Sequence, residues 1–243
     1  MKRLILAILL ICLLPFHASA FNPFLVLGGN VSAGIDTPTY VAYGENDNNF
    51  TAALTVAITS VAGTNRCFVA MFAWENQTQT VVSITYDGNA MTEIELYEGT
   101  NIKIGAWYYC TDTGTGSKDV VLTKSSTGPI AGWVFQVDGV NTADVVEDST
   151  VNEVAGDSPQ VISLAVTTTN TNTMILSGVA QPVVAAFSVY GSTGQTDLGD
   201  NGVDMGMAAG YYAFAKNGEK YQGWQSDQTY ERQYEVVVSL NGL

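Results

Sequence analysis

Short runs of apolar and β-branched residues recur along most of this chain, separated by clusters of glycine, asparagine, aspartate and serine. Their spacing of about eight to fifteen residues is typical of an antiparallel sandwich or barrel. No long window carries the 3.6-residue period of a capped amphipathic helix. The pattern predicts one all-β domain with strands at 50–59, 66–74, 81–86, 90–96, 103–110, 118–123, 130–137, 160–167, 173–180, 205–215 and 234–240.

One hairpin is specified in detail. Between 81 and 86, apolar residues alternate with serine and threonine, which indicates a strand with one buried and one solvated face. Asp87-Gly88 follows, and this dipeptide favours a type I′ turn because both central residues need a positive φ. Trp74, Trp107 and Trp133 lie within predicted strands and are expected in the core.

The first twenty residues predict export. Lys2 and Arg3 precede an apolar run at 4–16, and Ala18-Ser19-Ala20 forms a cleavage site before Phe21. The run is too short to span a bilayer as a helix, although a membrane anchor is the alternative interpretation. We therefore expect a secreted or cell-surface protein, with the periplasm as another compartment, and no transmembrane span after cleavage.

The region at 21–47 is rich in glycine and polar residues and is interpreted as an irregular N-terminal arm before a sandwich domain at 48–243. Its apolar stretch at 24–27 could complete an open sheet edge. It would do so within its own domain or in a neighbouring molecule, and the second arrangement would assemble subunits into a fibre.

Composition then restricts the chemistry. Cleavage removes Lys2 and Arg3, so the formal charge changes from −14 to −16, with 23 acidic residues left against 7 basic ones. Such a chain is not expected to bind nucleic acid or anionic lipid. His17 is the one histidine and it leaves with the leader, which excludes Ser-His-Asp and Cys-His catalysis and the usual zinc sites.

Cys67 and Cys110 are the two cysteines that remain after cleavage. Cys67 opens one predicted strand and Cys110 closes another, so antiparallel pairing of these strands would place both at the same end of the sheet. Cysteines of exported proteins commonly pair. We expect a disulfide, with two buried thiols as the alternative.

Calcium is the one cofactor for which the residues provide a candidate site. Three carboxylates and one amide lie close together in a glycine-containing segment read as a turn, and such oxygens are typical calcium ligands. These residues are Asp197, Asp200, Asn201 and Asp204. A weaker candidate comprises Glu45, Asp47 and Asn49, and a solvated turn is the alternative for the first segment.

Two further candidates concern carbohydrate. Tyr221 and Trp224 lie in a segment read as a loop and could stack on a sugar ring, unless the loop folds back and buries the tryptophan. Glu93, Glu95 and Glu98 could provide paired carboxylates for glycoside hydrolysis, with Glu93 and Glu95 expected on one strand face. A solvated strand face is the alternative interpretation.

Several short motifs resemble a widespread module of bacterial secreted and surface proteins and of phage structural proteins. They are the stretches at 64–70, 82–92, 106–109 and 131–140, with a C-terminal half around 194–212. The resemblance spans about 50–243 and implies a jelly-roll-like sandwich without defined catalytic residues. Asp87, in place of a glycine, and the order Val137-Asp138-Gly139-Val140 depart from the module's pattern at turns.

The two halves of the domain also end alike, at 132–140 and 234–243. This likeness indicates either a duplication or the common way in which a buried strand meets a turn. For function, the sequence favours a non-catalytic extracellular or cell-surface structural protein, including a self-associating assembly subunit. A carbohydrate-binding or adhesive module is the alternative, and a glycan-active enzyme is the third hypothesis.

Overall fold

Three antiparallel sheets account for the regular structure of the residues that are described. The computed structural model describes residues 38–75, 78–111, 114–155, 160–183, 185–191, 194–201, 205–214, 218–228 and 232–243, all of them in one compact unit. The leader and the first part of the expected arm, up to residue 37, lie outside these residues. The described part contains no helix, so no helix there is long and apolar enough to cross a membrane.

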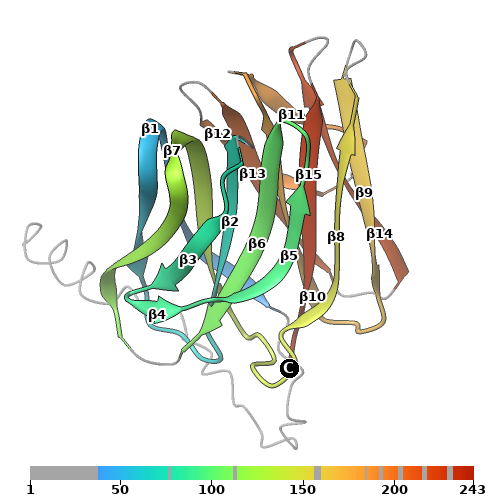
Figure 1. Ribbon diagram of the computed structural model, residues 1–243. Helices are drawn as coiled ribbons and strands as arrows, with labels where there is room; N and C mark the ends of the chain where they lie inside the picture. The colour runs from blue at the N-terminus through green and yellow to red at the C-terminus, as the bar shows by residue number, and fades with distance from the viewer. Residues whose placement is uncertain are drawn as a thin grey trace, which may run out of the picture. The chain divides into compact units, whose positions relative to one another are not determined.

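Fifteen strands follow one another along the described part of the chain (Figure 1). They are β1 (Thr39–Ser60), β2 (Cys67–Glu75), β3 (Val81–Tyr86), β4 (Asn89–Ala90), β5 (Thr92–Glu98), β6 (Ile102–Cys110), β7 (Gly116–Asp138), β8 (Val146–Val154), β9 (Gln160–Thr168), β10 (Thr173–Gln181), β11 (Phe187–Val189), β12 (Thr196–Asn201), β13 (Gly206–Phe214), β14 (Gly218–Ser226) and β15 (Gln233–Asn241). The expected all-β antiparallel fold is confirmed.

Strands β1 to β7 form the N-terminal half. The order is β4-β3-β7-β2-β6-β5, with β1 beside β7. The long strand β7 passes from one layer to another, because residues 120–124 pair with β3 and residues 130–137 pair with β2. An aromatic-rich core fills this half and includes Phe68, Phe72, Trp74, Trp107 and Leu122.

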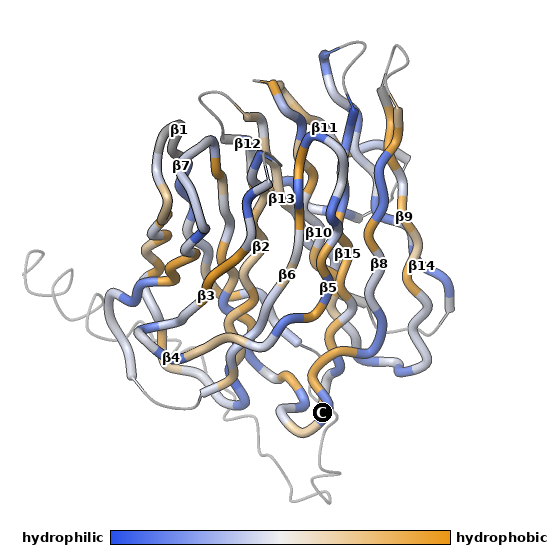
Figure 2. The backbone as a smooth tube through the Cα atoms, viewed as in Figure 1, coloured by the Kyte–Doolittle hydropathy of each residue, from blue (hydrophilic) through white to orange (hydrophobic). Residues whose placement is uncertain are grey.

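Strands β8 to β15 form the C-terminal half. One sheet has the order β12-β13-β10-β15-β8, and a smaller sheet has the order β11-β14-β9. Side chains between these two sheets include Ile162, Leu164, Val179, Trp224 and Val237. Apolar and polar residues alternate along many strands of both halves, as the hydropathy colouring shows (Figure 2).

A third core, here called the shared core, joins the halves. It takes side chains from β2, β6 and β7 of the first half and from β10, β13 and β15 of the second. The central members include Val69, Met71, Trp133, Phe135, Leu176, Met207, Val236 and Val238. Trp74, Trp107 and Trp133 are all buried, as expected from the sequence.

The two halves have the same strand order. The five-stranded order β8-β15-β10-β13-β12 of the second half matches, in the first half, the first part of β1, the second part of β7, and then β2, β6 and β5. The three-stranded order β9-β14-β11 matches the second part of β1, the first part of β7 and β3. In register, Cys67 pairs with Val137 in one half and Met174 pairs with Leu240 in the other. These correspondences support the duplication interpretation.

The Asp87-Gly88 turn is confirmed, with φ values of 48° and 81° between Tyr86 and its partner Asn89. The arm boundary is corrected. Residues 39–47 were expected to be irregular, yet they form the first part of β1 and pair with β7. Their polar residues suit an edge strand, because Asn46 Nδ2 donates to the Thr55 carbonyl at 2.7 Å and covers a backbone acceptor.

Candidate functional site

The disulfide lies where the sequence places it. Cys67 and Cys110 are directly opposed on β2 and β6, and their Cα atoms are 4.0 Å apart in the bridged pair. Since β2 and β6 both face the shared core, the bridge ties together two central strands. It also holds the end of β6, where Tyr108 lies two residues before Cys110.

The calcium candidate at 197–204 is not the turn that the sequence indicated. Residues 196–201 form the edge strand β12, with a bulge between Asp197 and Asp200. Asp197 accepts a bond from the Gly199 amide at 2.8 Å, and Asp200 accepts one from the Phe187 amide at 3.2 Å, so each carboxylate has a backbone partner. The side chain of Asn201 and all of Asp204 lie outside the described residues.

Parts of the two calcium candidates come close together. Burial raises the pKa of Glu45, and the nearby Asp47 and Asp200 raise it further. Among the residues with described positions, however, no group of three or more carboxylates, histidines or cysteines is arranged to hold a metal ion. Calcium at this edge stays a prediction.

The aromatic pair Tyr221 and Trp224 does not form a platform. Both lie on strand β14 rather than in a loop, and three residues of separation place them on opposite faces. Trp224 is completely buried and its indole N–H donates to Ser177 Oγ at 3.2 Å. Tyr221 is 54 % exposed, and its hydroxyl donates to Glu219 at 2.7 Å.

The expectation that Glu93 and Glu95 share one strand face is wrong. A bulge separates them, so Glu93 pairs with Trp107 and Glu95 pairs with Ala106. Trp107 and Ala106 point to opposite faces of β6, the first into the N-terminal core and the second into the shared core. The two carboxylates therefore lie on opposite faces as well.

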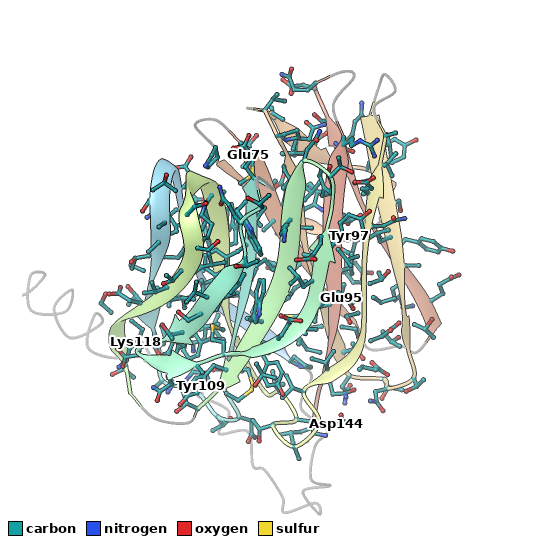
Figure 3. All side chains as sticks on the ribbon, in the orientation of Figure 1. Glu75, Glu95, Tyr97, Tyr109, Lys118 and Asp144 are labelled. Carbon is teal, nitrogen blue, oxygen red and sulfur yellow. A yellow bond between two sulfur atoms is a disulfide. The ribbon has the colours of Figure 1, made fainter. Side chains whose placement is uncertain are left out.

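The other carboxylates of β5 already have partners. Glu95 accepts a bond from Ser149 Oγ of β8 at 3.0 Å, and Glu98 forms an ion pair with Lys103 at 2.6 Å. Figure 3 shows Glu95 and Tyr97 on β5 beside β8, where the two halves meet. No carboxylate pair on β5 has the arrangement that was expected for glycoside hydrolysis.

A groove of about 290 Å³ opens at one end of this β5–β8 junction. Its lining comes from the start of β5, the end of β6 and the turn that leads into β8, near Asp144 in Figure 3. The lining residues are Thr92, Glu93, Ile94, Tyr108, Ala143, Asp144, Val145 and Val146. The groove thus combines an aromatic ring and aliphatic side chains with hydroxyl and carboxylate groups, and no basic residue lines it.

The groove is held in shape from several sides. Thr92 and Tyr108 are cross-strand partners. The Asp144 amide donates to the Asn141 carbonyl at 3.0 Å, and the Asn241 amide of β15 donates to the Val145 carbonyl at 2.9 Å. Fixed walls lower the entropic cost of ligand binding, so this groove suits a preformed binding site.

The correspondence between the two halves shows what is different at the groove. Thr92 pairs with Tyr108 in one half, and Thr196 pairs with Tyr211 at the corresponding positions of the other. Over Tyr211 lies the ring of Tyr40, with centroids 4.4 Å apart and planes 13° from parallel.

Val146 of β8 pairs with Leu240, and Tyr40 of β1 pairs with Val137. Because Leu240 and Val137 occupy corresponding positions in the two halves, Val146 corresponds to Tyr40. Val146 and Tyr108 both line the groove. Val146, which is smaller than tyrosine, therefore lies beside Tyr108 at the position that corresponds to Tyr40 beside Tyr211. The pattern of residues could not reveal this, because the correspondence becomes visible only with the strand register.

A second unusual region is the interior between the two sheets of the C-terminal half. Gln233, Glu235 and Gln222 have no exposed surface, and they point into this interior because Tyr234 and Val236 face the shared core. Buried polar side chains of the N-terminal half, such as Arg66 and Gln136, have hydrogen-bond partners, whereas several atoms of these three residues have none. They could not be singled out from the sequence, where each lies in an ordinary β pattern.

Several of these buried polar atoms have no partner. They are Glu235 Oε1 and Oε2, Gln233 Oε1 and Nε2, and Gln222 Oε1. Each unpaired buried group costs about 1–3 kcal/mol. Burial raises the pKa of Glu235 well above its ordinary value, and the backbone of Leu164 acts in the opposite direction.

Comparison with known proteins found no family model, curated protein or solved structure that matches this chain. The groove and the polar interior are therefore interpreted from their own geometry.

Proposed function

We propose that the protein is a non-catalytic extracellular or cell-surface binding protein whose groove takes one ring of an uncharged glycan. The observation that carries this proposal is the replacement of the stacked Tyr40 by Val146 at the corresponding position. A flat ring of similar size could then stack on Tyr108, as Tyr40 of β1 stacks on Tyr211 of β13.

The polar groups around Tyr108 favour a sugar over a purely apolar ligand. The hydroxyl of Thr92 can donate and accept hydrogen bonds, and the carboxylate of Asp144 can accept bonds from sugar hydroxyls. With no basic residue in its lining and an expected charge of −16 on the mature chain, the groove disfavours acidic glycans.

Binding is favoured over hydrolysis at this groove. The general acid of a glycosidase is usually a carboxyl group in apolar surroundings that raise its pKa. Glu93 and Asp144 are both exposed to solvent. The third hypothesis, a glycan-active enzyme, is addressed by measuring released reducing ends in the same binding experiment.

The test compares the mature chain (residues 21–243) with three variants on neutral polysaccharides, using affinity electrophoresis and calorimetry. Val146→Tyr should fill the groove and abolish binding, and Tyr108→Ala should remove the stacking surface. Tyr221→Ala is the control, because this exposed tyrosine lies away from the groove. Unchanged binding by Val146→Tyr, or loss of binding by Tyr221→Ala, would reject the groove as the site.

A structural role in an assembly is the second candidate. The shared core joins the halves into one unit, which suits a building block. Side chains cover edge groups: Asn46 bonds the Thr55 carbonyl, and the Asp148 carboxylate accepts the Thr167 amide at 2.7 Å. Such covering opposes strand addition at these edges. Assembly would then use the arm, and sedimentation of the mature chain with and without residues 21–29 tests this.

A further inference from the structure

The two halves meet at two junctions, and side chains close the first of them. Strand β5 lies beside β8 at this junction, whereas β1 lies beside β12 at the other. Across the β5–β8 junction, Ser149 Oγ donates to Glu95 at 3.0 Å. Further along β8, Glu153 forms an ion pair with Arg232. The β5–β8 junction thus contains a cation for a carboxylate of its edge strand.

The β1–β12 junction has a carboxylate at the same place but no such cation. Asp47 corresponds to Glu153, because it follows Tyr40 on β1 as Glu153 follows the matching Val146 on β8. The residue that corresponds to Arg232 is Pro129. The next residue along the chain from each of them is the one that pairs with the end of β1 or of β8.

The other chain segments at the β1–β12 junction do not supply the missing charge. Those without any lysine or arginine are 39–47, 130–137, 196–201 and 206–211. Lys124 of β7 donates to the Pro129 carbonyl at 3.3 Å, but it is buried. The carboxylate that acts on the pKa of Lys124, after the larger effect of burial, is Glu75.

Three carboxylates come close together at this junction. Burial raises the pKa of Glu45, and the charges of Asp47 and Asp200 raise it further. Glu45 and Asp200 are both exposed to solvent. In the described part of the chain, no such group is arranged to hold a metal ion. A larger cation can contact carboxylates that stand farther apart than the ligands of a metal.

Aromatic rings lie beside these carboxylates. Tyr43 is two residues before Glu45, so both side chains are on one face of β1, and Glu45 is opposite Trp133 on β7. The rings of Tyr43 and Trp133 stack with centroids 5.2 Å apart, yet Tyr43 is 42 % exposed. The stacked pair of Tyr40 and Tyr211 lies on its other side, with the Tyr40 centroid 6.5 Å away. Tyr43 is therefore an accessible ring held in place by its neighbours.

We propose that the β1–β12 junction binds a quaternary ammonium group of the choline type, with Tyr43 as the contacting ring and Glu45, Asp47 and Asp200 as the surrounding negative charge. An aromatic ring attracts a cation that lies within about 6 Å of its centroid. A trimethylammonium group presents methyl groups to the ring, whereas a primary ammonium is strongly hydrated. The charge of −16 expected for the mature chain also attracts cations.

The same carboxylates select against a ligand that carries a phosphate next to its ammonium group. Like charges repel, so free choline should bind more tightly than phosphocholine. The proposal does not depend on the groove at the β5–β8 junction, which uses other residues. A failure of glycan binding there would leave it intact.

The test is a titration of the mature chain with choline chloride, followed by saturation-transfer NMR of the methyl protons of choline. A chelator keeps calcium from competing for the carboxylates. The neutral analogue 3,3-dimethyl-1-butanol has the same shape without the charge, and it should not bind measurably. Phosphocholine is the third ligand, and tighter binding of it would overturn the choice of a ligand without phosphate.

Two variants test the residues. Tyr43→Leu and Glu45→Gln should each weaken choline binding about two- to fivefold, and the double variant about tenfold. Far-UV circular dichroism checks that each variant folds, and Glu45→Gln serves alone if Tyr43→Leu does not. Tyr221→Leu is the matched control, because Tyr221 is also an exposed tyrosine beside a carboxylate, that of Glu219, but lies on β14.

Three results would overturn the proposal. The wild-type chain would fail to bind choline, or it would bind the neutral analogue equally well. Alternatively, the folded variants at Tyr43 and Glu45 would bind choline like the wild type. A loss in Tyr221→Leu as large as that in Tyr43→Leu would place the binding elsewhere and count equally against the junction.

Discussion

Lys124 offers a direct measurement of how burial acts in this fold. It lies at the bend of β7 and is only 3 % exposed. Its ammonium group donates to the carbonyls of Gly128 at 2.9 Å and Pro129 at 3.3 Å, which closes the bend. Burial lowers the pKa of Lys124 from 10.5 to about 8, and Glu75 opposes the shift only in part.

The sign of the effect on stability follows from the two protonation states. Between pH 8 and pH 10.5 the unfolded chain holds a proton on this lysine that the folded chain has lost, so the free energy of unfolding rises with pH. The contribution is complete above the unfolded pKa and is lost as the pH falls through the folded pKa. A shift of about 2.5 units corresponds to about 3.4 kcal/mol. Of this, about 1.8 kcal/mol should appear between pH 7.5 and 9.5.

The measurement is urea unfolding of the wild type and of Lys124→Met at half-unit steps from pH 7.5 to 9.5. Methionine keeps the length of the side chain but cannot titrate. The wild type should therefore gain about 1.8 kcal/mol relative to the variant over this range. Tyrosine ionisation begins near pH 10 in both proteins and cancels in the difference. Parallel pH curves would show that Lys124 keeps an ordinary pKa in the folded protein, which would refute the reasoning.

Three other substitutions test the remaining parts of the fold. Replacing Cys67 and Cys110 by alanine should lower the free energy of unfolding by about 4 kcal/mol in denaturant titrations, because a long loop is released in the unfolded chain. Burial acts to raise the pKa of Glu147, but hydrogen bonds from the loop after β9 outweigh it and keep this pKa low. Glu147→Gln should therefore cost about 2 kcal/mol at pH 7, and the difference should vanish as the pH falls through the folded pKa. Gly132→Ala should cost about 1–3 kcal/mol in thermal melts because the Phe72 ring must move, and an unchanged melt would contradict the close packing.

The sequence predicts the buried strands well because their side chains face apolar cores. The runs that begin at Cys67 and Thr173 became β2 and β10, and the opposition of Cys67 to Cys110 follows from pairing the start of one strand with the end of another. The Asp87-Gly88 turn was equally predictable, since its conformation depends on two residues alone. Local chemistry specifies these features.

Polar strands were missed for a physical reason. The segments that form β8, β12 and the first part of β1 lie at sheet edges, where polar side chains cover unpaired backbone groups. Strand β14 is central in its sheet, yet its inward residues include Gln222 and Ser226, so its hydrophobic alternation is interrupted. Bulges are also invisible in the pattern, and the one on β5 reversed the expected arrangement of Glu93 and Glu95.

The candidate sites depend on a comparison that only the fold allows. The positions of Val146 and Tyr40 correspond through the register of β8 and β1, and their sequence surroundings share no motif. The same is true of Glu235 and Gly132, which differ in size, charge and neighbours. Sequence reasoning treats such residues one at a time, and none of them is unusual alone.

The two halves contribute differently to the stability of the fold, because their interiors differ in how apolar they are. The shared core is filled by aliphatic and aromatic side chains from both halves, and the N-terminal core adds Phe68, Phe72, Trp74 and Trp107. Burial of such side chains contributes about 1.5–3 kcal/mol each, so these two cores can stabilise the whole unit. The outer interior of the C-terminal half is then free to contain Glu235 and its neighbouring glutamines at a cost in stability. After a duplication, one half can keep the stabilising core while the other acquires polar groups, and in this protein the polar groups lie in the second half.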